Sequence, residues 1–430
     1  MAARLATTYA ERCLWQAQVE PPAASTGALP TNADVVVVGA GLCGLAAADE
    51  LARAGRSVVV LDKEALGWGA ASRNGGMVIP ELKAGPTALE AKLGPLGRRL
   101  YDEVNAAFDH VESAIAGDDG RGGIACDYTR SGQLFLAHSP RHVPGLQAMA
   151  HEHGEVLGEP VRFVSRSDLV GEIGSTAFFG GVVMERTGGL HPARFHAGLA
   201  ARTLGSGASV HDRTAVTAVD RQAGSHRIET TRGTIHAADV LLATNAYADA
   251  AVPELAARVL PVGSYIIATE VLDPAVARSV SPTGRMMVDT KNFLFYWRLT
   301  PDGRLAFGGR RSLDPVDVPE ARDFLFDEMV RLHPQLADTS VEYAWGGNVA
   351  VTLDRLPHVG RIDDAWYATG CNGSGVALNT WLGHRLAETI LGRTSPPAFA
   401  ELTHRRIPLR SWRNAYLPVV SRWFAFEDGR

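Results

Sequence analysis

Three glycines near the start of the chain have the spacing of a nucleotide-binding turn. Gly39, Gly41 and Gly44 follow the apolar run DVVVV and precede LAAADELARAG, so they connect a predicted strand to a predicted helix. Gly39 permits the tight turn, Gly41 leaves room for a pyrophosphate beside the backbone, and Gly44 lets the helix pack close to the strand. The free backbone N–H groups at the helix start favour phosphate charge.

An acidic residue completes this motif. The second predicted strand, SVVVLD, ends at Asp62, where a carboxylate can accept hydrogen bonds from ribose hydroxyls and disfavours a 2′-phosphate. Strand, helix, strand and acid together favour dinucleotide binding over a glycine-rich turn that binds nothing. The motif does not distinguish NAD from FAD. Because no second strand-linked GxGxxG occurs, we expect one bound dinucleotide.

The order of predicted strands and helices around this turn indicates an α/β protein of two domains. One is a Rossmann-type dinucleotide-binding domain, and the other is an α+β domain built on an antiparallel sheet, to which SYIIATEVL, NFLFYWRLT and RLAFGGR contribute strands. The alternation of strands and helices returns after an insertion that lacks a nucleotide signature. The predicted boundaries give residues 1–95, 185–260 and 340–430 to the dinucleotide-binding domain, and 96–184 and 261–339 to the second, substrate domain.

Composition excludes several other classes. The chain has 430 residues, 46% of them hydrophobic, and a net charge of −5 without a dense Lys/Arg run, so neither nucleic acid nor membrane is an expected partner. The longest apolar stretch, Val35 to Leu51, contains three glycines, Asp49 and Glu50, and predicts no membrane span. The N-terminus lacks the apolar core of a signal peptide.

The potential metal ligands and nucleophiles are scattered. Four isolated cysteines (13, 43, 126 and 371) fit a reducing cytoplasm, and Cys371 is interpreted as a packing residue. His151 and His153 flank Glu152 on a predicted solvated helix, and no histidine has metal-ligand spacing, so no metal is expected. Ser374 lies in NGSGV rather than GxSxG, which argues against a hydrolase.

Three further segments carry a family resemblance. They read GWGAASRNGGMV (67–78), WGGNVAVTLDRLPHVGR (345–361) and YATGCNGSGVALNTWLG (367–383). In this order they resemble the flavin-binding elements of the D-amino-acid oxidase and glycine oxidase family, most closely its γ-glutamylputrescine oxidoreductase-like branch. The resemblance covers nearly the whole chain, and it implies that the dinucleotide is FAD and that the first domain is an FAD-binding domain.

The resemblance also implies which residues contact FAD. The adenosine and pyrophosphate would contact Gly39, Gly41, Gly44, Asp62 and Lys63, and the loop that runs past the pyrophosphate and the flavin ring would contribute Ala71, Ser72, Gly75, Gly76 and Met77. Val216 would meet the adenine, and Thr244 would lie near the nucleotide. The loop at the pyrimidine side of the isoalloxazine would contribute Gly370, Gly373, Ser374, Gly375 and Val376. The last loop opens a predicted helix, whose N–H groups would favour negative charge on reduced flavin. Without the resemblance, this loop reads equally well as a helix cap.

Covalent attachment of the flavin is not expected. In relatives such as the sarcosine oxidases it needs a Cys or His, but the corresponding cysteine position falls near Gly347, and the RNGG loop contains no His. The predicted cofactor is therefore non-covalent FAD.

The expected substrate is an amine. Members of the family that oxidise amino acids hold the carboxylate with arginines, but the corresponding positions here fall near Val349 and Gly373. This departure favours a primary or secondary amine without an adjacent carboxylate. Tyr296, Trp345 and Asn348 are candidates for the pocket lining, although a place in the core fits them equally, and Arg298 either binds a remote carboxylate or is structural.

The expected reaction needs little acid–base help from the protein. Hydride transfer from the carbon next to a neutral amine to flavin N5 gives an imine, which hydrolyses to an aldehyde or ketone, and O₂ or another acceptor reoxidises the flavin. We therefore assign no general base. Two alternatives remain open: an amino-acid oxidase or dehydrogenase of the same family, and a flavin-binding protein without amine turnover. The sequence does not distinguish oxidase from dehydrogenase.

Overall fold

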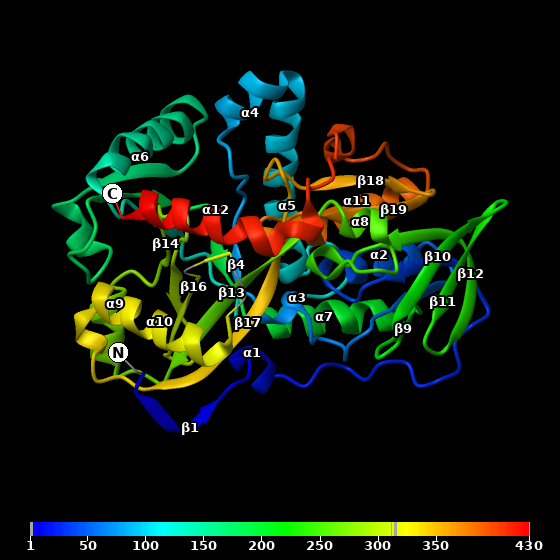
Figure 1. Ribbon diagram of the computed structural model, residues 1–430, viewed down its shortest axis with the longest axis horizontal. Coiled ribbons are helices and arrows are strands. Elements are labelled where there is room, and N and C mark those ends of the chain that lie inside the picture. The colour runs from blue at the N-terminus through cyan, green and yellow to red at the C-terminus, as the bar shows by residue number, and fades with distance from the viewer. Residues whose placement is uncertain (1–2, 311, 314–315, 430) are drawn as a thin grey trace.

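Two sheets dominate the computed structural model, which describes residues 3–310, 312–313 and 316–429 (Figure 1). The first sheet, with eight strands, has the order β10-β11-β12-β2-β3-β9, and β19 and β18 continue from β12. Its strands are β2 (Asn32–Val38), β3 (Val58–Leu61), β9 (Ser209–His211), β10 (Val216–Gln222), β11 (Ser225–Thr230), β12 (Gly233–Leu242), β18 (His358–Ile362) and β19 (Ala365–Thr369).

The second sheet has nine strands in the order β1-β17-β13-β16-β15-β14-β5-β7-β6. It is antiparallel except for the parallel pairs β1 with β17 and β14 with β5. Its strands are β1 (Leu5–Ala10), β5 (Gln133–Leu136), β6 (Val161–Ser165), β7 (Gly180–Met184), β13 (Leu260–Thr269), β14 (Met286–Asp289), β15 (Tyr296–Leu299), β16 (Leu305–Gly309) and β17 (Val341–Val351). The predicted combination of a Rossmann-type α/β domain with an antiparallel sheet is confirmed.

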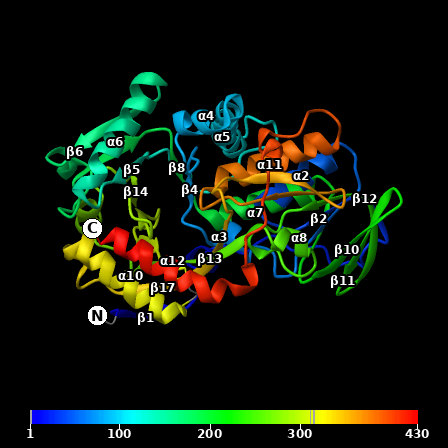
Figure 2. The ribbon, with the colours of Figure 1, turned by 45° about the horizontal axis from the view of Figure 1, so that its top comes forward.

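Helices cover both sheets (Figure 2). In Figure 1, α2 and α7 lie with the first sheet, whereas α9 and α10 lie with the second. The α-helices are α1 (Leu14–Ala17), α2 (Leu42–Arg53), α3 (Ala70–Arg73), α4 (Pro86–Leu93), α5 (Pro95–Ala116), α6 (Val143–Ala150), α7 (Pro192–Gly205), α8 (Pro253–Ala256), α9 (Pro274–Val280), α10 (Val318–Leu332), α11 (Gly375–Ile390) and α12 (Arg413–Asp428). A short antiparallel pair joins β4 (Met77–Val78) to β8 (Gly188–Gly189).

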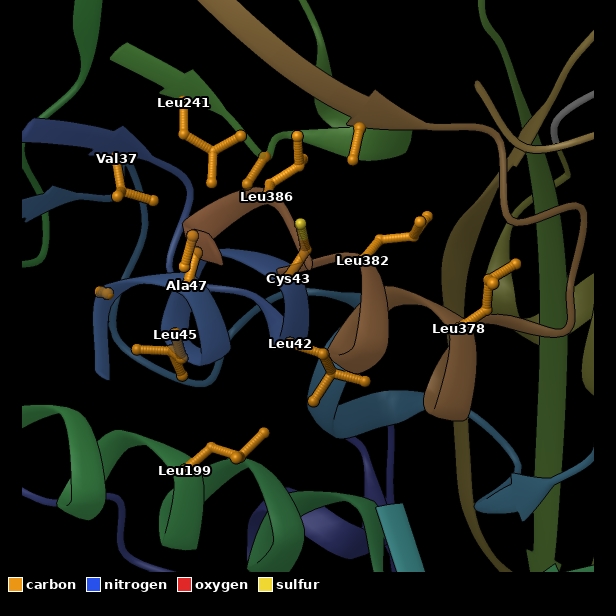
Figure 3. Packing of buried hydrophobic residues seen from close by; sticks show 14 of the residues in the cluster. Val37, Leu42, Cys43, Leu45, Ala47, Leu199, Leu241, Leu378, Leu382 and Leu386 are labelled. Carbon is orange, nitrogen blue, oxygen red and sulfur yellow. The ribbon is translucent and has the colours of Figure 1, made fainter. Parts of the chain in front are cut away.

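The alternation of valines in β2 explains why its strand is buried on both faces. Val35 and Val37 pack into a core with α2, α7 and α11, and Val36 and Val38 pack into a second core on the opposite face. Figure 3 shows the first of these cores, where leucines of α2, α7 and α11 meet around Cys43. This packing fixes the start of α2 against the end of β2.

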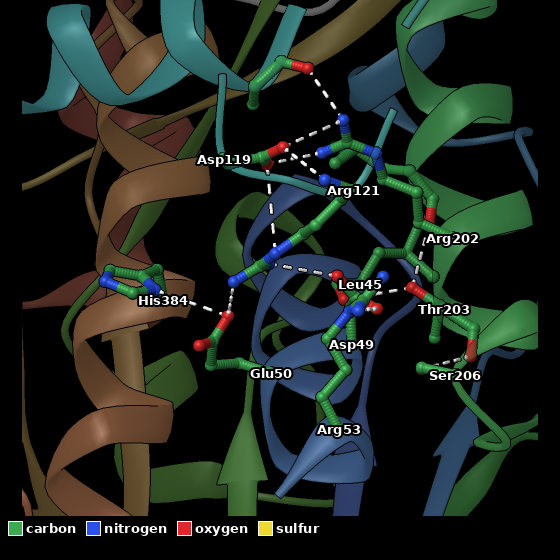
Figure 4. Close-up of polar contacts among 12 residues, drawn as sticks. Leu45, Asp49, Glu50, Arg53, Asp119, Arg121, Arg202, Thr203, Ser206 and His384 are labelled. Carbon is green, nitrogen blue, oxygen red and sulfur yellow. Dashed lines mark hydrogen bonds and ion pairs between the residues drawn. The ribbon is translucent and has the colours of Figure 1, made fainter. Parts of the chain in front are cut away.

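A buried polar network holds the same helices at their other ends (Figure 4). Arg121 pairs with Asp49 at 3.1 Å and also with Glu50, both on α2. Arg202 of α7 pairs with Asp119 at 2.8 Å, and His384 of α11 lies 3.5 Å from Glu50. Because these charges are largely withdrawn from water, each is compensated by a partner.

Two strands and one helix lie in a different part of the fold from the one that the predicted boundaries give them. β1 and β17 belong to the second sheet, although residues 1–95 and 340–430 were assigned to the FAD-binding domain. The helix predicted in the insertion is α5, but its apolar face packs in the core of α2 and α11. Hydrophobic patterning identifies a buried face without identifying the partner that covers it.

Candidate functional site

The predicted glycine turn adopts the conformation that its chemistry requires. Gly39 has a φ of +108°, and a Cβ there would lie 2.8 Å from the carbonyl oxygen of Ala243. A Cβ on Gly44 would lie 1.9 Å from the carbonyl oxygen of Gly39, so only glycine lets α2 approach the strand this closely. A Cβ on Gly41 would meet nothing within 4 Å, because it would project into a cavity.

This cavity has a volume of about 980 Å³ and runs from the glycine turn to the second sheet. That volume lies at the upper end of the usual range for small-molecule and cofactor sites. The predicted FAD-binding residues that line it are Gly39, Gly41, Asp62, Lys63, Ala71, Gly75, Met77, Val216, Thr244, Gly373, Ser374, Gly375 and Val376. The cavity therefore gathers segments that lie far apart in the sequence.

Asp62 is fixed at the edge of the cavity by backbone donors. Its Oδ2 accepts the N–H of Ala40 at 2.8 Å, and its Oδ1 accepts the N–H of Glu64 at 2.9 Å. Burial raises the pKa of Asp62. Each carboxylate oxygen has more than one acceptor position, so Asp62 can still accept ribose hydroxyls, as predicted. Lys63 pairs with Asp249 at 3.1 Å.

Two helices begin at the cavity without a side-chain cap. The N-cap of α2 is Gly41, which has no side chain, and that of α11 is Ser374, whose side chain does not cap the helix. The hydroxyl of Ser374 is buried and has no hydrogen-bond partner among the described residues. Unsatisfied N–H groups and a buried free hydroxyl are the donors that an anionic dinucleotide takes up. The residues present therefore fit a dinucleotide.

The RNGG loop is locked by its own asparagine. Asn74 donates to the carbonyl of Ala71 at 2.9 Å and accepts the N–H of Gly76 at 2.8 Å. Gly76 has a φ of +72°, and a Cβ there would lie 2.2 Å from the carbonyl oxygen of Leu190. These contacts hold Gly75 and Met77 at the cavity wall.

Four predicted cofactor residues do not line the cavity and act behind it. The hydroxyl of Ser72 bonds to the carbonyl of Gly67 and accepts from Gln16 at 2.8 Å. A Cβ on Gly370 would lie 2.3 Å from Thr352, so Gly370 shapes the loop before α11. Gly44 and Gly76 likewise permit close backbone approach.

Two of the four predicted substrate-pocket residues line the cavity, namely Tyr296 and Asn348. Trp345 is not a lining residue. It is 4% exposed, packs edge-on against Trp15, and donates from Nε1 to the carbonyl of Arg73 at 2.8 Å. Its side chain faces the core because residues alternate between the two faces of β17.

Arg298 is also absent from the cavity lining. It donates from Nη2 to the carbonyl of Leu190 at 2.7 Å and lies over the ring of Trp15. Burial lowers the pKa of Arg298 to about 10. Of its two predicted roles, the structure supports the structural one, because the side chain braces the wall behind Gly76 and Gly189.

The charged residues of the cavity wall that sequence reasoning missed include three from the second sheet and its turns: Asp289, Lys291 and Arg310. Asp289 ends β14, Lys291 lies in the following turn, and Arg310 follows β16. None belongs to a motif. The signal that could have identified Asp289 is its place as a single acid at the end of the apolar run MMV.

The predicted solvated helix around Glu152 is partly wrong. His153 is 6% exposed and contacts Glu159 at 2.7 Å through Nδ1, whereas His151 is exposed. Among the described residues, no group of His, Cys, Asp and Glu side chains could hold a metal ion, and no helix has the length and apolarity to cross a membrane.

One cavity is lined by a Rossmann-type unit, by two helix starts without side-chain caps and by a second sheet. This combination defines a dinucleotide-binding oxidoreductase fold. Glycine oxidase from Geobacillus kaustophilus has this fold, with a TM-score of 0.76 at 20% identity over 88% of this chain and 100% of that one. The profile of the DAO family, FAD dependent oxidoreductase, matches residues 34–389. The chain belongs to this family.

Two relatives in the family are similar over most of their length. The probable oxidoreductase OrdL of Haemophilus influenzae is 33% identical over 369 residues, which cover 84% of this chain and 83% of that protein. The γ-glutamylputrescine oxidoreductase of Escherichia coli is 30% identical over 404 residues and 92% of each chain. The resemblance inferred from three segments is confirmed, and the chain is an FAD-dependent oxidoreductase.

Proposed function

We propose that this protein oxidises a primary or secondary amine to an imine, which water hydrolyses to an aldehyde or ketone. FAD, when bound, supplies the two-electron acceptor, and O₂ or another acceptor then removes the electrons. The proposed substrate resembles γ-glutamylputrescine, the compound named in the Escherichia coli relative. The isolated cysteines support a cytoplasmic location.

The observation that carries this proposal is the carboxylate of Asp289 in the cavity wall. Its Oδ1 accepts the N–H of Phe295 at 3.0 Å, whereas its Oδ2 is buried without a hydrogen-bond partner in the described part of the chain. Burial raises the pKa of Asp289 to about 7. A buried carboxylate oxygen that lacks a donor is suited to an ammonium group.

Aromatic side chains surround the same region. Phe293, Tyr296 and Phe424 all line the cavity, and the rings of Phe293 and Phe424 meet edge-on with centroids 5.9 Å apart. Such rings attract a cation and exclude water from the carbon beside it. The chain thus binds and orients the amine. The ammonium releases a proton to solvent before the hydride step, which needs the neutral amine, so we assign no general base to the protein.

Non-covalent binding is part of the proposal. The family resemblance puts the position of the sarcosine oxidase cysteine near Gly347, and the RNGG loop contains no Cys or His. Acid precipitation of the purified protein should therefore leave all of the FAD in the supernatant. Yellow colour that remains in the pellet would contradict this part of the proposal.

Product analysis tests the reaction. The protein should convert γ-glutamylputrescine, putrescine or a simple alkylamine to an aldehyde that is trapped as a hydrazone. Oxidation of glycine or another α-amino acid with no amine turnover would instead support the amino-acid oxidase alternative. No product from either group would support a flavin protein without amine turnover.

A further inference from the structure

The C-terminal helix α12 carries large apolar side chains on its outer face. They are Trp412, which is the N-cap of the helix, Val419, Trp423 and Phe426, and they are 55–68% exposed. At about 3.6 residues per turn, these positions lie within about 60° of one another around the helix axis, so they form one stripe. A contiguous apolar patch of this kind on a protein surface marks an interaction site.

The inner face of α12 attaches the helix to the protein. Leu417 is buried, the hydroxyl of Ser421 accepts the N–H of Leu313 at 2.9 Å, and Phe424 lines the cavity. Asp428 holds the last turn of the helix to the loop after β14. In Figures 1 and 2, α12 runs along the outside of the molecule beside α10. The attachment therefore uses the inner face and leaves the apolar stripe toward solvent.

Positive charge accompanies the apolar stripe. Residues 404–430 contain six arginines and two acidic residues, in a chain whose net charge is −5. One of these arginines, Arg406, pairs with Glu254. Arg422 is exposed on α12, and the exposed Arg141 donates to a backbone carbonyl in the last turn of the helix. Aromatic side chains bordered by arginines complement the headgroup region of an anionic bilayer.

A second copy of the chain fits the stripe less well than a lipid surface. A stable interface buries about 800 Å² on each partner, whereas an aromatic side chain offers at most about 250 Å², and those of the stripe are only partly exposed. Pro418 lies inside α12, where it removes a backbone hydrogen bond and disturbs the regular helix that close helix pairing needs. A lipid surface has no fixed shape to match, so neither limit applies to it.

We propose that α12 docks the protein on an anionic lipid bilayer, with the helix axis in the plane of the surface and the apolar stripe among the headgroups. The helix lies on the membrane and does not cross it, in agreement with the lack of a spanning helix among the described residues. Composition did not predict a membrane partner because the arginines form no dense run. Since Phe424 faces the cavity from the same helix, docking places that part of the cavity wall beside the bilayer.

Flotation of the FAD-loaded protein with lipid vesicles tests the proposal. The wild type should bind vesicles of equal parts phosphatidylglycerol and phosphatidylcholine more than about tenfold more tightly than pure phosphatidylcholine, and added salt should weaken that binding. Trp423→Gln should lower the affinity about 10- to 100-fold and Val419→Gln about 3- to 10-fold, because each removes apolar surface from the lipid. Arg422→Gln should lower it about fivefold.

Val271→Gln is the matched control for Val419→Gln. Val271 is 55% exposed, and its Cγ1 lies 3.5 Å from the place of a Cβ on Gly303. Gly303 follows β15, whereas α12 contacts the loop before that strand, so the control lies at the other end of the sheet. Val271→Gln should bind vesicles like the wild type. Each variant should keep the wild-type urea midpoint, because the substituted side chains are exposed.

Several results would overturn the proposal. They are a wild type that does not float with the anionic vesicles, unchanged vesicle affinity in Trp423→Gln, and an equal loss of affinity in Val271→Gln and Val419→Gln. Size-exclusion chromatography with light scattering tests the second copy: a wild-type dimer that Val419→Gln dissociates, without flotation, would assign the stripe to self-association. Vesicle binding does not involve the reaction of the flavin, so its failure leaves the proposed amine oxidation intact.

Discussion

At the scale of single residues, the site depends on positions where glycine, which has no Cβ, leaves space for a ligand or for another part of the backbone. Gly41 faces open space in the cavity, whereas Gly44 faces the carbonyl of Gly39 across a gap that admits no Cβ. Gly41 is therefore needed for ligand binding and Gly44 for folding, although both belong to the same motif. Asp289 and Arg310 add the charges that the motif does not contain.

Substitution at the two glycines should have opposite consequences. Gly41→Ala should leave the urea-unfolding free energy of the flavin-free protein nearly unchanged and weaken FAD binding, because its methyl group would occupy the space of the pyrophosphate. Gly44→Ala should lower the unfolding free energy by about 1–3 kcal/mol or more, because α2 must move away from the strand. Fluorescence titration with FAD and urea denaturation measure the two effects. An unfolded Gly41→Ala would contradict this division.

Asp289 should make stability depend on pH. Its folded pKa of about 7 lies above the ordinary value of 3.8, so its favourable contribution is complete below pH 4 and is lost as the pH rises to about 7. Asp289→Asn keeps an acceptor for the N–H of Phe295 and stays neutral. The variant should therefore gain stability over the wild type between pH 5 and 8, by at most about 4 kcal/mol.

Urea denaturation at pH 5 and at pH 8, with equal FAD loading, measures the difference in unfolding free energy between Asp289→Asn and the wild type. Asp338→Asn is the control, since the Asp338 side chain is fully exposed in its contact with Arg4. It should follow the wild type at both pH values. A constant difference between Asp289→Asn and the wild type would show that Asp289 does not titrate in this range.

Single residues were predictable where a motif constrains the backbone. The glycine turn and Asp62 follow from spacing, because nucleotide binding demands particular conformations there. The RNGG loop was predicted from the family resemblance alone. Asp289 and Arg310 were missed because their role depends on which strands adjoin in the sheet. Arg298 and Arg310 both look like strand arginines, and only the fold shows which one faces the cavity.

At the scale of elements, the RNGG loop is supported by residues behind it. Trp345 on β17 and Arg298 on β15 bond to the carbonyls of Arg73 and Leu190, on either side of the RNGG loop. The elements themselves were largely predictable from periodicity, including α2, α5 and β15. Their partners were not, because α5 could cover either sheet equally well by pattern.

The C-terminal helix α12 lies over the second sheet and closes part of the cavity (Figure 1). The carboxylate of Asp428 accepts the N–H groups of Asn292 at 2.7 Å and Phe293 at 2.9 Å, and Phe424 reaches the cavity wall. Asp428→Ala should release the end of α12, so amide exchange should rise in residues 413–428 and stay slow in α11. Hydrogen–deuterium exchange mass spectrometry measures this, and unchanged exchange in α12 would contradict its attachment through Asp428.

At the scale of the whole molecule, one cavity lies between two sheets whose strands come from different segments of the chain. The first sheet supplies the glycine turn and Asp62, and the second sheet supplies Tyr296, Asp289 and Arg310. β17 belongs to the second sheet, and the strands and helix after it return to the first. The change of sheet therefore follows Val351, rather than falling at the predicted boundary of residue 340. The division into an FAD-binding and a substrate domain remains our proposal for how the two sheets share the work.

Anaerobic titration of the purified yellow protein with amines tests the central claim most directly. Absorbance of the oxidised flavin should fall on addition of a primary or secondary amine and should not change with the N-acetylated form of the same amine, which cannot yield the imine. A flavin that no amine reduces, while dithionite bleaches it fully, would contradict amine oxidation.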